Sequence, residues 1–210
     1  MADEKKVGEV VEACTTDFVA QCYELYQSPA LGSLVKARYE VNTALPEPGI
    51  YLYGVVDKVV TAGMEPGRRP IARGKNEASE EDIYRTNPQL TKLLKSEFNV
   101  LVIGYKKDGR VFQVLPPQPA HIHGFVHLCA EEEVKEFSRS LYFLNTLLKA
   151  RLEIPVEELV ISTLRQMSQV YGLEQHAFLV TAGKELASLL SEDYVQLKAI
   201  LRGLKYDTAR

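Results

Sequence analysis

The chain has 210 residues, of which 46% are hydrophobic and 25% charged, a composition typical of a soluble globular protein with room for a sizeable core. Its formal net charge of −3, with 15 basic and 16 acidic residues in positions 1–128, argues against a dedicated nucleic-acid binder. No apolar run approaches the roughly 18 residues of a transmembrane helix, and the charged start "MADEKKVGEVVEA" lacks the apolar centre of a secretory signal. We therefore expect a cytoplasmic protein with no membrane partner.

The N-terminal part of the sequence predicts short β-strands. The segment 33–41, "SLVKARYEV", alternates most clearly, with apolar side chains on one face and Lys36, Arg38 and Glu40 on the other. A longer β-branched and aromatic strand follows in "IYLYGVVDKVV", where Gly54 predicts a bulge or a tight bend.

A basic loop comes next. The stretch "AGMEPGRRPIARGKNEAS" contains four cationic residues, Arg68, Arg69, Arg73 and Lys75. Because arginine suits phosphate and carboxylate by its bidentate geometry, one interpretation is an anion-binding or partner-binding loop. The alternative is a solvated loop in which one arginine pairs with an acidic neighbour such as Glu65 or Glu77.

This loop does not match a phosphate-binding P-loop. A P-loop requires G-x-x-x-x-G-K-[ST], but Arg69 occupies the position of the first glycine and Asn76 that of the hydroxyl residue. Pro70 also removes a backbone N–H that a phosphate cradle would use. ATP hydrolysis by this segment is therefore not expected.

Residues 79–97 predict a helical excursion from the strands. Ser79 is a suitable N-cap for one short helix, and Asn87-Pro88 suits the N-cap and N1 positions of a second helix through "QLTKLLKSEF". Beyond it, Asp108-Gly109 between two apolar runs predicts a β-hairpin, and "HIHGFVHL" predicts a final strand. Short strands separated by turn signals favour a small barrel over residues 1–128.

Three histidines in the last strand raise the possibility of a metal site. His121, His123 and His127 share one parity, which is a spacing that zinc ligands use. Gly124 interrupts the alignment and no cysteine or acidic residue completes the set, so hydrogen-bonded histidines are the favoured interpretation. The three cysteines form no C-x-x-C pair, and nucleophile motifs such as G-x-S-x-G are absent. We expect no enzymatic activity, metal or cofactor.

From about residue 130 the apolar period changes from 2 to 3.6, which predicts a helical region over residues 129–210. The first helix is expected through "AEEEVKEFSRSLYFLNTLLKARL", and later starts at Pro155, Glu174 and Ser191 bring the expectation to about four helices. Tyr142, Phe143 and Leu147 widen the apolar face of the first helix. They are interpreted either as core between helices, which is favoured, or as a protein interface.

The order of several short motifs in residues 7–128 resembles the HAS-barrel, the domain shared by HerA-type ATPases and ATP synthase subunits. The motifs are "VGEVVEACTTDFV", "SPALGSLVKARYE", "YGVVDKVV", "EPGRRPIARG", "SEEDIYRTNPQL", "FNVLVIGY" and "VLPPQPAHIHGFV". The resemblance implies a small six-stranded barrel that assembles subunits. The chain departs from the HerA pattern because helices, and no motor with Walker motifs, follow the barrel, so ATPase activity is not inherited.

These observations together predict an α+β protein with an N-terminal antiparallel barrel and a C-terminal helical region. The leading functional hypothesis is a non-catalytic assembly or adaptor protein that binds a protein partner, such as a HerA-type ATPase, or forms a homo-oligomer. A nucleic-acid accessory factor acting through Arg68, Arg69, Arg73 and Lys75 is the second hypothesis. A metal-dependent enzyme at His121, His123 and His127 is the third and least favoured.

Overall fold

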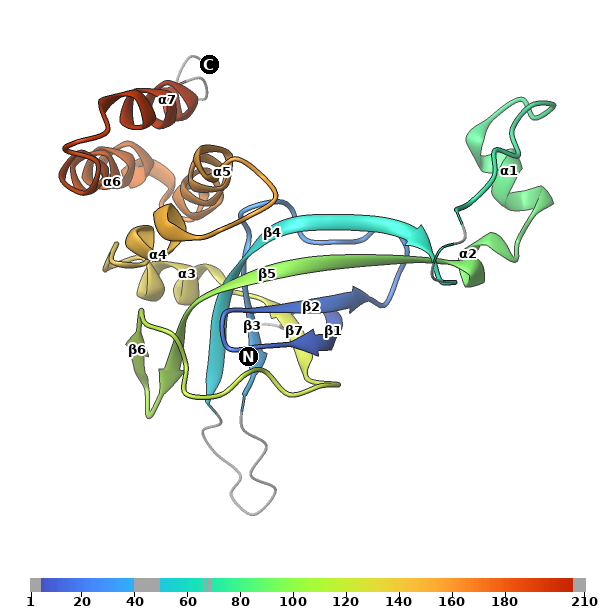
Figure 1. The fold of residues 1–210 in the computed structure, drawn as a ribbon, viewed down its shortest axis with the longest axis horizontal. Coiled ribbons are helices and arrows are strands. Elements are labelled where there is room, and N and C mark those ends of the chain that lie inside the picture. Colours follow the sequence, from blue (N-terminus) through green and yellow to red (C-terminus); the bar gives the residue numbers. More distant parts are fainter. Residues whose placement is uncertain (1–4, 40–49, 66, 68, 206–210) are drawn as a thin grey trace.

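A computed structural model describes residues 5–39, 50–65, 67 and 69–205 (Figure 1). Seven antiparallel strands follow the order β2-β1-β7-β3-β4-β5-β6, and an additional pairing of β2 with β5 closes six of them into a barrel, from which β6 extends. The strands are β1 Lys6–Ala13, β2 Asp17–Cys22, β3 Leu34–Arg38, β4 Tyr51–Gly63, β5 Leu94–Lys107, β6 Arg110–Phe112 and β7 Phe125–Leu128. The predicted small antiparallel barrel is therefore confirmed.

The barrel interior is filled by the apolar residues of alternating strand positions. Phe18, Leu52 and Phe98 are among the side chains that are at most 1% exposed there. Gly54 lies at a register shift between β4 and β5, as predicted for a bulge. A Cβ atom at this position would clash with Val100 Cγ1 and lie 2.7 Å from Leu101 O, so only glycine permits this close strand approach.

The two long strands β4 and β5 extend beyond the barrel as a two-stranded arm. Strand β3 accompanies β4 only over Tyr51–Val55, whereas β4 and β5 stay paired as far as Gly63 and Leu94. Helices α1 (Glu80–Thr86) and α2 (Leu90–Leu93) lie at the far end of the arm (Figure 1). The predicted helical excursion is confirmed, and Ser79 Oγ accepts the backbone N–H of Asp82 as its N-cap.

The second helix of the excursion is shorter than predicted. Its N-cap is Gln89 and not the predicted Asn87. Asn87 instead ends α1, because its backbone and side-chain N–H groups both donate to Ile83 O. From Leu94 onward the segment pairs with β4, and these ladder hydrogen bonds replace the helix that the local sequence favours.

The helical region begins close to the predicted boundary, with two residues between the end of β7 at Leu128 and the start of α3 at Glu131. It contains α3 (Glu131–Phe137), α4 (Phe143–Lys149), α5 (Val156–Gln169), a 3₁₀ turn (Gly172–Glu174), α6 (Gln175–Leu189) and α7 (Tyr194–Lys205). The single first helix of the prediction is wrong, because α3 and α4 are separated by residues 138–142.

Gln113 explains this break. Its Nε2 donates to Phe137 O at 2.7 Å and to Ser140 O at 2.9 Å, while its Oε1 accepts the backbone N–H of Phe143 at 2.9 Å. One buried carboxamide therefore satisfies backbone groups at the end of α3 and the start of α4 that a continuous helix would have paired internally.

The helices pack on the outer face of the barrel. A second hydrophobic core combines Leu34 of β3, Tyr53 and Val55 of β4, and Leu101 and Ile103 of β5 with the inward side chains of the helices. Strands β3, β4 and β5 thus form a wall with one core inside the barrel and another outside it.

Three lysine–glutamate ion pairs join the barrel to the helical region. Each has an N–O distance of 2.6 Å, and they join Lys36 to Glu133, Lys106 to Glu136, and Lys58 to Glu153. Lys36 lies on the face of β3 opposite to Val35, as the alternation predicts, but α3 covers that face and leaves Lys36 only 4% exposed. Glu40, in the same predicted strand, lies outside the described residues.

A membrane-spanning helix is absent from the described ranges, since each helix there is too short or too polar to cross a bilayer.

Candidate functional site

The predicted basic loop lies at the end of the arm. Arg69, Arg73 and Lys75 are exposed there, and Arg68 lies outside the described residues. Arg73 Nη1 donates to Asn87 Oδ1 at 3.2 Å, which holds the loop against the end of α1.

Apolar side chains share this end of the arm with the arginines. A hollow of about 240 Å³ forms the surface that we call the arm tip, lined by Gly63, Met64, Glu65, Arg69, Pro70, Ile71, Arg73, Leu90, Leu93 and Leu94. Ile71 is 72% exposed, Met64 50% and Leu93 47%. Such a cluster of exposed apolar groups beside guanidinium groups is typical of protein-binding surfaces.

The arm is braced by the loop between β2 and β3. The Tyr26 and Tyr84 hydroxyls lie 2.6 Å apart, and the Tyr26 backbone N–H donates to Ser96 Oγ at 3.0 Å. The hydrogen bond with Tyr26 raises the pKa of Tyr84 to about 12. Thr61 Oγ1 and Ser96 Oγ, 2.8 Å apart, add a bond across the arm. These contacts fix the direction in which the arm leaves the barrel.

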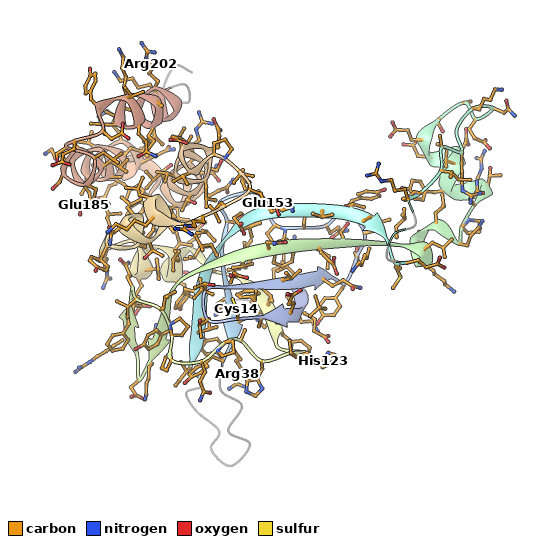
Figure 2. All side chains as sticks on the ribbon, viewed as in Figure 1. Cys14, Arg38, His123, Glu153, Glu185 and Arg202 are labelled. Atoms are coloured by element: carbon orange, nitrogen blue, oxygen red, sulfur yellow. The ribbon has the colours of Figure 1, made fainter. Side chains whose placement is uncertain are left out.

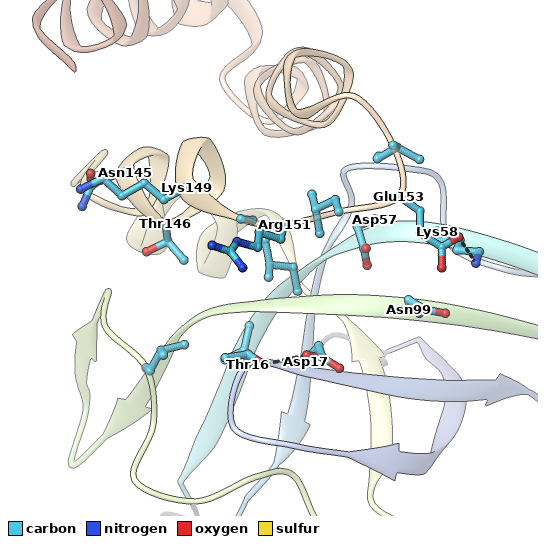
Figure 3. Close-up of a pocket in the computed structure, with 16 residues that line it drawn as sticks. Thr16, Asp17, Asp57, Lys58, Asn99, Asn145, Thr146, Lys149, Arg151 and Glu153 are labelled. Carbon is cyan, nitrogen blue, oxygen red and sulfur yellow. Dashed lines mark hydrogen bonds and ion pairs between the residues drawn. The ribbon is translucent and has the colours of Figure 1, made fainter. Parts of the chain in front are cut away.

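A second candidate site is a cavity of about 570 Å³, which we call the junction cleft (Figure 3). Its barrel side consists of Thr16, Asp17, Asp57, Lys58, Asn99, Leu101, Val102 and Leu115, and its helical side of Asn145, Thr146 and residues 149–154. It therefore lies between β4, β5 and the segment that joins α4 to α5.

Asp57 occupies a β-bulge in this cleft. Val56 pairs with Val100 and Lys58 pairs with Asn99, so Asp57 has no partner residue on β5. The bulge lets two consecutive side chains, Asp57 and Lys58, line the same cavity, whereas a regular strand would point them to opposite faces.

The Asp57 carboxylate is poorly solvated. Its Oδ1 is buried and has no hydrogen-bond partner, and none of the described side chains forms an ion pair with it. Burial raises the pKa of Asp57, with its own backbone N–H and Lys58 acting in the opposite direction. Its neighbour Lys58 is paired with Glu153 on the far wall (Figure 3).

The cleft has charged and polar groups that can bind a ligand. Within the described residues its lining includes carboxylates, cations, amides and hydroxyls, but no histidine, cysteine or serine. The cations Lys149 and Arg151 lie on the helical wall.

The three histidines are not brought together as metal ligands. β7 begins only at Phe125, so His121 and His123 lie in the turn before it, and His123 has a left-handed φ of 65°. His123 Nδ1 lies 2.6 Å from Glu9 Oε1, whereas His127 is in the strand. In the part of the chain that the structure describes, no three His, Cys, Asp or Glu side chains are grouped so as to hold a metal ion.

The helical interface candidates divide into two kinds. Phe143 and Leu147 are fully buried in the core that the helices share with the barrel wall, so their side chains are not exposed on the surface of this chain. Tyr142 is 56% exposed, because it precedes α4 at the break that Gln113 stabilises. Figure 2 shows the side chains of the described residues on the ribbon.

Sequence reasoning missed Asp57. The available signal was the charged dipeptide Asp57-Lys58 in the otherwise apolar run "YGVVDKVV", where a regular buried strand accommodates no charge.

Comparisons with protein-family models and with curated protein sequences found no match.

Proposed function

We propose that this chain is a non-catalytic assembly or adaptor protein that binds a protein partner through the arm tip. The observation that carries the proposal is the exposed apolar cluster of Met64, Ile71 and Leu93 beside Arg69 and Arg73, held at the far end of a braced arm. An arm of this kind presents a small binding surface to a second molecule while the barrel stays clear of it.

The chemistry of the arm tip favours a protein over a nucleic acid. Nucleic-acid binding requires an excess of cations along a groove, but the acidic first turn of α1, with Glu80, Glu81 and Asp82, lies close in sequence to the basic loop. A partner surface with an apolar patch and nearby carboxylates would match both features of the arm tip. The resemblance of residues 7–128 to HAS-barrels favours a like barrel or a HerA-type ATPase as that partner.

The experiment compares self-association and partner capture by the wild type and by Ile71→Asp. Light scattering after size-exclusion chromatography reports the oligomeric state, and affinity capture with mass spectrometry identifies bound proteins. Val195→Asp is the matched control, because Val195 is also an exposed apolar residue, 80% exposed, on α7.

We expect Ile71→Asp to lose association or capture while retaining the wild-type melting temperature, and Val195→Asp to retain both. The proposal is wrong if the wild type is strictly monomeric and captures no protein, or if Ile71→Asp binds as the wild type does. Retention of nucleic acid at low salt, lost when Arg69 and Arg73 are replaced, would instead support the accessory-factor hypothesis.

A further inference from the structure

We propose that the junction cleft is a binding site for a guanidinium or primary ammonium group, with the Asp57 carboxylate as its anionic partner. This site is separate from the arm tip, and the proposal does not depend on the adaptor function.

The Asp57 side chain lies in the cleft without a described ion-pair partner. A β-bulge directs its side chain into a cavity of about 570 Å³, and the adjacent Lys58 is already engaged by Glu153 at 2.6 Å. Lys58 is therefore held toward the opposite wall, and no described side chain neutralises Asp57 by an ion pair. An unsatisfied carboxylate in a cavity lacks the hydrogen-bond donors that buried anions normally have.

The chemistry of the missing partner follows from what surrounds Asp57. Lys58 is engaged by Glu153, and the cations Lys149 and Arg151 lie on the helical wall. On the barrel wall, Asp57 Oδ1 has no described hydrogen-bond partner, and a positively charged N–H donor supplies what this carboxylate lacks. A metal ion would need further ligands, and the described residues offer no group of three that could supply them.

The other residues that line the cleft can contact the aliphatic and neutral polar parts of such a ligand. Leu101, Leu115 and Leu152 provide apolar surface, while the Asn99 and Asn145 amides provide neutral hydrogen-bonding groups. The volume exceeds that of one guanidinium group, and cavities of this size hold ligands with several functional groups. The cation therefore comes either from a small molecule or from an arginine or lysine side chain of an extended peptide.

The test uses blocked amino acids, so that the side chain carries the only charge. Binding of N-acetyl-arginine amide and N-acetyl-lysine amide is measured by NMR chemical-shift titration of the full chain, with N-acetyl-citrulline amide as the neutral near-isostere. We expect the shifts to map to Asp57, Asn99 and the 149–154 segment, and the citrulline compound to bind about tenfold more weakly.

Two variants test whether binding of the cationic probes depends on Asp57. Asp57→Asn preserves the size of the side chain and is expected to weaken binding of the arginine compound about tenfold. Glu192→Gln changes an exposed carboxylate that does not line the cleft, and we expect less than a threefold change there. Melting curves of both variants establish that they are folded.

A five-residue blocked peptide with a central arginine distinguishes the two sources of the cation. Tighter binding of the peptide than of N-acetyl-arginine amide identifies a protein segment, and equal binding identifies a small molecule; both support the site. The proposal is overturned if neither cationic probe binds the wild type, if citrulline binds equally well, or if Asp57→Asn binds as the wild type does.

Discussion

Lys36 Nζ lies 2.6 Å from Glu133 Oε1 and joins a strand of the barrel to the first turn of α3. The same glutamate accepts the Ala130 backbone N–H through its Oε2, so one carboxylate both caps the helix and receives the lysine. Burial, together with the nearby Cys129 and Glu133, raises the pKa of Tyr53, whose hydroxyl is 3.5 Å from Glu133 Oε1.

Removal of Lys36 is expected to destabilise the protein strongly. Lys36→Met leaves Glu133 without its cation in a largely buried position and should lower the free energy of unfolding by roughly 2–4 kcal/mol. Lys58→Met is the matched control, because Lys58 and Glu153 form a pair of the same length that is 34% and 78% exposed, and its loss should cost less than about 1 kcal/mol. Urea denaturation of both variants measures the difference, and equal losses would contradict the assigned role of burial.

Gln113 is expected to be the most sensitive glutamine of the chain. Gln113→Ala leaves two carbonyls and one N–H unpaired at the break between α3 and α4, which should cost roughly 2–4 kcal/mol. Gln118→Ala, an exposed position in the same connection, should change the free energy of unfolding by less than about 0.5 kcal/mol. Thermal denaturation compares the two, and a mild effect at Gln113 would show that α3 and α4 are separated by another cause.

Asp57 should make the protein less stable as the pH rises. Because burial raises the pKa of Asp57 in the folded chain above its unfolded value, the folded state holds the proton more tightly, and the charged form costs stability above the folded pKa. Asp57→Asn should therefore increase the free energy of unfolding at pH 7. The gain should shrink as the pH falls and vanish below the unfolded pKa of about 3.9.

Denaturant titrations of the wild type and Asp57→Asn between pH 3 and pH 8 measure this difference. A stability gain that is independent of pH would show that the substitution acts through packing and not through the charge.

Alanine substitutions at Gly54 and Gly183 should change the free energy of unfolding in opposite directions. A Cβ at Gly54 would lie 2.7 Å from Leu101 O as well as against Val100, so Gly54→Ala should cost roughly 1–3 kcal/mol. At Gly183, inside α6, the new Cβ meets only Leu201 Cδ2 at 3.5 Å, and the helix gains about 0.5–1 kcal/mol. Melting temperatures of the two variants test the pair, and a stable Gly54→Ala would contradict the close approach of β4 and β5.

Those elements that depend on neighbouring residues in sequence were predictable. The alternation in β3, the Asp108-Gly109 hairpin and the Ser79 cap all have local causes, and the structure contains each of them. Asp108 and Gly109 have φ values of 48° and 74°, which is the left-handed conformation that this dipeptide favours.

Elements that depend on distant residues were not predictable. The helix break at residues 138–142 is stabilised by Gln113, which lies in the connection after β6 and gives no sign of this contact in the sequence. The short α2 has a similar cause, because pairing with β4 decides where the helix ends. Local propensity is a weak guide wherever tertiary hydrogen bonds compete with it.

The candidate sites also combine features that the local sequence predicts with features that depend on distant residues. The exposure of Arg69, Arg73 and Lys75 follows from their Gly- and Pro-rich surroundings. The proximity of Arg69 and Arg73 to Leu90 and Leu93 depends instead on how the chain folds at the end of the arm. The place of Asp57 in a cleft could not be predicted, because it depends on the β-bulge and on the helical segment that forms the other wall.

The wall formed by β3, β4 and β5 has a consequence for any attempt to divide the protein. Tyr53 and Val55 contact the helices, while Leu52 and Val56 on the same strand fill the barrel. A fragment ending at Leu128 would expose the outer side of this wall to water and would be prone to aggregate, and the helices alone would lack the surface on which they fold. We therefore expect the barrel and the helices to unfold as one cooperative unit, and a chimera that keeps only one of them must supply a replacement for the missing side.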